Sequence, residues 1–227
     1  MDDWTKAIVT FVGGFFTALV AKPLLEWMVR PRLRLSLNDS PDCLSFTPEG
    51  DFNKPSGHAC YLRLRVRNWW GGVARNVQCF LVRIDLRLEG NRHFEQAPFF
   101  DTQELAWASR GPECWNPMHI PRGLTRYVDL LHSSTRHPVS FAPCIKYRPL
   151  REIVIGYPPG TWRFTVIAAG ENVAPRRFTF DLEWRNSWND FEVRAGRFRR
   201  VRISTRDHYA RTPDAFKPSP DGGQPKI

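Results

Sequence analysis

The chain has 227 residues, 42% of them hydrophobic, which is enough to bury one good core. Its formal net charge of +10 indicates affinity for an anionic partner, either nucleic acid or an acidic membrane surface. The five cysteines are odd in number and include no Cys-x-x-Cys pair, which argues against a full disulfide framework and a zinc knuckle and favours free thiols in a reducing compartment.

The first predicted element is a helix near the amino terminus. In Ala7–Leu25 the only charged residue is Lys22, and at 1.5 Å per residue this stretch spans about 28 Å, close to the hydrocarbon thickness of a bilayer. Trp4 and Trp27 bracket it at the depth of an aromatic belt. We predict one transmembrane helix within residues 1–30, with the Lys22 side chain extending to the headgroups.

Two alternatives stay open for this stretch. A cleaved signal peptide needs a basic start and small residues before the cut, whereas this chain begins with Met1, Asp2 and Asp3. A buried or interfacial helix is the second alternative, and the charges of Lys22 and Glu26 favour it.

Flanking charge predicts the orientation of the helix. Acidic residues precede it, and four basic residues lie at its end or follow it: Lys22, Arg30, Arg32 and Arg34. By the positive-inside rule the carboxy-terminal domain is cytoplasmic, in a single-pass protein of the inner membrane. Free thiols are typical of a reducing compartment, so the cysteines support this orientation independently of the flanking charge.

Small residues recur along the predicted helix at spacings of three and four. They are Thr10, Gly14, Ala18 and Ala21. Such a face lets helices approach closely, so it predicts a homo-oligomer through the membrane helix. The alternative is that small residues are simply common in membrane helices.

Beyond Pro31 the sequence alternates at period two, as half-buried strands do. In Tyr61–Asn68 the apolar side chains share one face, and Arg63, Arg65 and Arg67 share the other, which we expect to be exposed. Farther on, the apolar residues change from odd-numbered to even-numbered positions near Phe80–Val82. This change predicts a bulge or a strand crossing between sheets.

The most secure predicted hairpin is TWRFTVIAAG followed by RFTFDLEW, with the turn residues of GENVAPR between them. Its core-facing residues are Trp162, Phe164, Val166, Ala168, Phe178, Phe180, Leu182 and Trp184. Seven or eight short segments between Arg32 and Thr205 alternate in this way. We predict a mainly β chain, with an antiparallel two-sheet sandwich over residues 31–206 and a disordered tail over 207–227.

The stretch LRVRNWWGGVARNVQCFL resembles the strand–turn–strand signature of immunoglobulin-like domains of the bacterial CARDB and fibronectin type III kind. The matching residues are Val66, Asn68, Gly71 or Gly72, Ala74, Asn76 and Val77. Ile120–Leu130 and PPGTWRFTV resemble later turns of those domains, whereas the extra tryptophan and glycine and the long segment His93–Pro121 depart from them. The resemblance implies an immunoglobulin-like β-sandwich that mediates contacts, and it carries over no catalytic residue.

The Trp-Trp-Gly-Gly junction contains residues that a turn requires and residues that it does not. Asn68 and the pair Gly71 and Gly72 suit a turn because Asn and Gly accept positive φ. Trp69 and Trp70 are not needed for the turn, so they either pack in the core or contact a partner or the bilayer.

Little in the sequence points to catalysis. The histidines form no metalloprotease motif, and no phosphate loop, dinucleotide fingerprint or nucleophile elbow is present. Asp129, His132 and either Ser133 or Ser134 are the residue types of a hydrolase triad, but their adjacency in the sequence is no evidence of triad geometry. We predict no catalytic residue, no metal site and no cofactor.

Arginines carry the stronger signal. Besides the three arginines of Tyr61–Asn68, a second basic segment supplies Arg197, Arg199 and Arg200. Attraction to an acidic leaflet contributes about 1 kcal/mol per basic residue near the surface. The same arginines also suit a solvated strand face or a surface that binds nucleic acid.

These observations predict a membrane-anchored cytoplasmic binding or scaffolding module without catalytic activity, whose partners are membrane lipids and a protein. One alternative is an oligomerising membrane effector in stress or antiphage defence, in which the sandwich senses a ligand and the helix forms a pore or leak. The other is nucleic-acid binding through the arginine-rich face.

Overall fold

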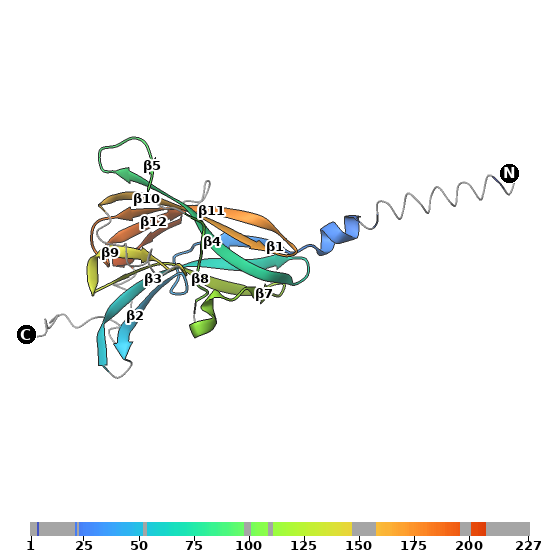
Figure 1. Cartoon of the computed structure of the whole chain (residues 1–227), viewed down its shortest axis with the longest axis horizontal. Helices are drawn as coiled ribbons and strands as arrows, with labels where there is room; N and C mark the ends of the chain where they lie inside the picture. The colour runs from blue at the N-terminus through green and yellow to red at the C-terminus, as the bar shows by residue number, and fades with distance from the viewer. Residues whose placement is uncertain are drawn as a thin grey trace, which may run out of the picture.

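The structure is a computed structural model that describes residues 4, 21, 23–51, 54–97, 101–108, 111–146, 158–195 and 201–207. These residues form two antiparallel sheets, so the predicted mainly β class is confirmed. Residues 23–29 are helical and lead into the first strand. In Figure 1 this blue helical segment leaves the sheets at the end where β1 begins.

The first sheet has five strands. They are β1 (Arg32–Ser36), β2 (Leu44–Asp51), β3 (Lys54–Trp70), β8 (Thr125–Ser134) and β9 (His137–Pro143). Their order is β1-β3-β8-β9, and β2 also pairs with β3. Because β3 is long, β1 pairs with its last residues and β2 with its earlier ones, on the same side.

The second sheet has eight strands. The main ones are β4 (Ala74–Leu88), β10 (Gly160–Gly170), β11 (Val173–Trp184), β12 (Phe191–Ala195) and β13 (Val201–Ser204). The order is β13-β12-β11-β10-β4-β5, with three short strands along β4: β5 (Glu95–Gln96), β6 (Gln103–Glu104) and β7 (Met118–Ile120). A 3₁₀ turn, η1 (Gly111–Trp115), precedes β7.

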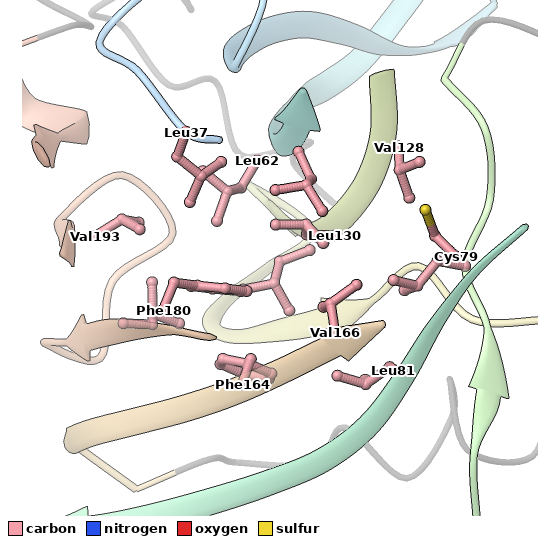
Figure 2. Close-up of a cluster of buried hydrophobic side chains, with 14 of the residues drawn as sticks. Leu37, Leu62, Cys79, Leu81, Val128, Leu130, Phe164, Val166, Phe180 and Val193 are labelled. Carbon is pink, nitrogen blue, oxygen red and sulfur yellow. The ribbon is translucent and has the colours of Figure 1, made fainter. Parts of the chain in front are cut away.

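One hydrophobic core joins the two sheets. Figure 2 shows side chains of both sheets meeting there, with Leu62 and Leu130 from the first and Phe164 and Phe180 from the second. Phe141 of β9 lies edge-on to rings of the second sheet, its centroid 5.0 Å from that of Trp184 and 6.0 Å from that of Phe164. Burial of such side chains stabilises the fold by roughly 2 to 3 kcal/mol each.

The predicted hairpin is confirmed as β10 and β11. Phe164 lies opposite Phe180, and Trp162 lies opposite Leu182. All the expected core-facing residues are buried except Phe178, which is half-buried and packs against the core.

The predicted irregularity in β4 is also confirmed. Thr165 of β10 pairs with Arg83, but the next residue, Val166, pairs with Leu81. Val82 is therefore an extra residue in β4, and this bulge reconciles the two side-chain phases.

The Trp-Trp-Gly-Gly junction carries the chain between sheets, because β3 belongs to the first sheet and β4 to the second. The predicted turn is present at residues 71–73. It crosses from one layer to the other instead of closing a hairpin.

Several predictions fall outside the described residues. These are most of the predicted spanning helix, its small residues Thr10, Gly14 and Ala18, the arginines Arg197, Arg199 and Arg200, and the tail from residue 208. Ala21 is described and helical. Over the part of the chain that the structure describes, no helix combines the length and apolar character needed to cross a bilayer.

Candidate functional site

The β3–β4 turn caps the end of the helical segment 23–29. The indole N–H of Trp70 donates to the carbonyl of Met28 at 3.0 Å. The amide of Gly72 donates to the carbonyl of Val29 at 2.7 Å. Carbonyls in the last turn of a helix have no partner inside the helix, so the turn supplies the acceptors with donors and fixes the helix end against the sheets. We call this contact the helix–turn junction.

Gly71 is required by the closeness of this contact. Its φ is +78°, and a Cβ at this position would lie 2.3 Å from the carbonyl oxygen of Arg30. Both the conformation and the approach exclude a side chain. The predicted structural role of the glycines is therefore confirmed at Gly71, with the helix end as a second reason.

Asn68 acts differently from the prediction. Positive φ occurs at Gly71 and Asn76, whereas Asn68 lies in strand β3. Its buried side-chain amide donates to the carbonyls of Gly72 at 2.7 Å and Ile120 at 2.9 Å. Asn68 is thus a side-chain link between the turn and β7, because its one amide group donates to a carbonyl of each.

A third segment closes this end of the domain. In the β10–β11 turn, the side chain of Asn172 donates to the carbonyl of Val73 at 2.9 Å and accepts from the amide of Arg75 at 2.8 Å. Glu171 accepts a hydrogen bond from the side chain of Asn76. The helix end, the β3–β4 turn and the β10–β11 turn therefore form one hydrogen-bonded unit.

Tryptophans project from this unit into solvent. The side chains of Trp69, Trp70 and Trp27 are 46%, 37% and 58% exposed. Further exposed apolar side chains lie on the helical segment or near the turn: Leu24, Leu25, Met28, Val29, Val73 and Leu124. Exposed apolar surface of this kind marks an interaction site. We call these residues together the tryptophan surface.

Arginines accompany the tryptophans. The guanidinium of Arg32 lies 4.4 Å from the ring centroid of Trp27, and that of Arg122 lies 5.5 Å from the ring centroid of Trp70. Arg30 and Arg67, which are close to these tryptophans in the sequence, are also exposed. Aromatic rings with adjoining cations are the side chains that favour the headgroup region of a bilayer.

The predicted exposed row of arginines on β3 needs correction. Arg63 donates from Nε to Asp129 of β8 at 2.8 Å, and the two side chains are only 19% and 15% exposed. Burial raises the pKa of Asp129, and the hydrogen bond and charge of Arg63 offset this in part. Arg65 is half-buried, and only Arg67 of the three is exposed. Alternation alone did not reveal that Asp129 of β8 stands opposite Arg63 in the sheet.

The residue types of a hydrolase triad are not assembled as one. Asp129 is engaged by Arg63, and the hydroxyl of the buried Ser133 donates to the carbonyl of Trp188 at 2.7 Å. The sulfur of Cys144 lies 3.8 Å from Nδ1 of His132. None of the five cysteines forms a disulfide, and burial strongly raises the pKa of the Cys60 and Cys79 thiols. Among the described residues no cluster of three metal-ligating side chains occurs.

Sequence reasoning identified Trp27, Trp69 and Trp70 but missed Asn172 and Arg122, whose roles depend on turns that meet only in the fold. The Asn in GENVAPR is a turn signal that could have indicated the first of these. No protein-family model matches the chain, and neither a curated protein nor a solved structure matches it.

Proposed function

We propose that the protein is a membrane-anchored binding module without catalytic activity, in which an immunoglobulin-like β domain is held on the cytoplasmic face of the inner membrane. One observation carries this proposal: the exposed tryptophans and their arginines lie at the end of the domain from which the chain leads back to its apolar amino-terminal stretch.

The geometry of the helix–turn junction supports this arrangement. The hydrogen bonds to Met28 and Val29 tie the helix end to the turn that bears Trp69 and Trp70. From Leu25 to Arg30 the chain advances about 7 Å at helical rise, so a helix spanning to Leu25 places Arg30 among the headgroups. The tryptophan surface then lies at the depth that tryptophan prefers.

Charge supports the same orientation. Arg32 and Arg122 lie over tryptophan rings, and Arg30 and Arg67 are exposed and close to these tryptophans in the sequence. Each basic residue contributes about 1 kcal/mol when close to an anionic leaflet. Nucleic-acid binding through β3 has less support, because Arg63 is committed to Asp129 and Arg65 is half-buried.

The oligomerising effector is a second candidate because the end of the helical segment 23–29 is hydrogen-bonded to the turn that connects the two sheets. Gly71 allows backbone contact with Arg30, and Asn172 links the same turn to the second sheet. A ligand that shifts the sheets would therefore move the helix end. Bulky substitutions at Gly14 and Ala18 separate the candidates, since they abolish membrane permeabilisation by an effector and leave a scaffold in place.

Anchoring and orientation can be tested together in cells that express the full chain. We expect the protein in the membrane fraction after high-salt washing, and a membrane-impermeant maleimide should label the half-exposed Cys114 and Cys144 only after lysis. Recovery of the full chain in the soluble fraction, or labelling in intact cells, would overturn the proposal.

A further inference from the structure

A groove of about 470 Å³ opens between β1 and β11, beside the helix–turn junction. Its lining residues are Leu33, Arg34, Leu35, Trp69, Arg176 and Arg177. The groove lies where both sheets end. Strand β1 is the last strand of its sheet, and within the described residues β12 pairs with β11 from Phe180 to Trp184.

The described lining residues of this groove include three arginines and no acidic residue. Arg34, Arg176 and Arg177 are all exposed, and none forms an ion pair with a carboxylate of the described residues. Arg176 stands in register opposite the buried Ala168, on the strand face that Phe178 and Phe180 otherwise fill with apolar side chains. A cation at this core-facing position places positive charge at the mouth of the sandwich.

A second hollow in the molecule differs in the pairing of its charges. It lies at the Leu88–Pro159 end of the second sheet and has a volume of about 610 Å³. Two of its lining arginines, Arg185 and Arg194, are paired with Glu183 at 2.9 and 2.7 Å, and a third, Arg87, donates to the hydroxyl of Thr161 at 3.2 Å. Arg185 and Arg194 are therefore already neutralised by a protein carboxylate, whereas the three arginines of the β1–β11 groove have no such partner among the described residues and are available to an anion.

We infer that the β1–β11 groove binds the phosphate of an anionic phospholipid headgroup. Guanidinium groups of Arg34, Arg176 and Arg177 would hold the phosphate oxygens through charge-assisted hydrogen bonds, and Trp69 would contact the glycerol region. This inference rests on the proposed function, because it requires the domain to lie at the bilayer surface. It adds the chemical class of the lipid and the residues that recognise it.

Position favours a lipid as the source of the phosphate. Trp69 belongs both to the groove and to the tryptophan surface. Arg34 follows Arg30 by only four residues, about 13 Å of extended chain at most, so the groove stays close to the point where the helix ends. A headgroup in the leaflet around the helix therefore lies within reach.

The inference can be tested with the full chain in neutral detergent, titrated with short-chain phosphatidylglycerol and followed by tryptophan fluorescence and thermal unfolding. We expect saturable binding that Arg176→Gln/Arg177→Gln weakens about tenfold or more, since two charged hydrogen-bond donors are lost. The control Arg92→Gln/Arg126→Gln removes the same charge from exposed arginines outside the groove. An unchanged unfolding midpoint without lipid shows that the variants fold.

Three results would overturn the inference. The first is that the groove variant and the control bind phosphatidylglycerol with equal affinity. The second is that short-chain phosphatidylcholine binds as well as phosphatidylglycerol. The third is that inorganic phosphate or single-stranded nucleic acid saturates the protein at the same concentration as the lipid. The detergent titration needs no bilayer. A protein that proves soluble in cells therefore contradicts the proposed function, while the titration still reports on the groove.

Discussion

The carbonyl of Val29 accepts a 2.7 Å hydrogen bond from the amide of Gly72, which joins the end of the helical segment to the crossing between the two sheets. The Trp-Trp-Gly-Gly sequence thus binds its own chain on one side and exposes tryptophan on the other. Through this junction, the β domain fixes the orientation of the helical segment 23–29.

Gly71→Ala should destabilise the protein more than Gly90→Ala. Both glycines have positive φ, +78° and +88°, but an added Cβ meets the carbonyl of Arg30 at 2.3 Å in the first and nothing within 4 Å in the second. We expect Gly90→Ala to cost about 1 kcal/mol and Gly71→Ala at least twice as much, measured by denaturant unfolding of the full chain. Equal losses would show that the helix end does not pack against the turn.

Asn68→Ala should lower the free energy of unfolding by about 2 kcal/mol, because it leaves the carbonyls of Gly72 and Ile120 without their donor in a buried site. Asn91→Ala is a suitable control, since Asn91 is exposed in a loop at the far end of β4. If Asn68→Ala lowers the free energy of unfolding no more than the control does, the proposed link between the turn and β7 is wrong.

Arg63→Met should destabilise the protein by about 2 kcal/mol at neutral pH, because Asp129 then keeps a half-buried charge without a partner. Arg63→Met/Asp129→Leu should recover most of the loss. Denaturant unfolding of the unsubstituted protein, the single variant and the double variant at pH 7 tests this prediction. A double variant as unstable as the single variant would contradict it.

The effect of pH on Arg63→Met follows from the direction of the Asp129 pKa. Burial raises this pKa above the unfolded value of about 3.9, so the folded state binds more protons between the two values. The group's contribution to stability therefore falls as pH rises through that window. We expect the loss of unfolding free energy in Arg63→Met to become smaller as the pH is lowered toward the pKa of Asp129. A loss that does not depend on pH would contradict the role of the Asp129 charge.

Local features of the sequence were predictable where one strand determines them. Alternation located β3, β10 and β11, and the change of phase near Val82 located the bulge, because burial on one face imposes period two on each strand. The turn glycines followed from backbone conformation in the same way.

Relationships between distant segments were not predictable. Arg63 and Asp129 lie 66 residues apart and meet only because β3 pairs with β8, so alternation assigned Arg63 to solvent. The β1–β11 groove combines residues of two sheets, Leu33–Leu35 and Trp69 of the first with Arg176 and Arg177 of the second. Strand order and sheet ends are set by tertiary packing, which a single sequence does not reveal.

Quenching of tryptophan fluorescence by lipids brominated near the headgroup tests the central claim most directly. In vesicles containing the full chain, we expect strong quenching that falls when Trp69 is replaced by Phe, because Trp69 is 46% exposed on the tryptophan surface. Replacement of the buried Trp188 by Phe should leave the quenched intensity unchanged. Quenching that does not depend on Trp69 would contradict the placement of this surface in the bilayer interface.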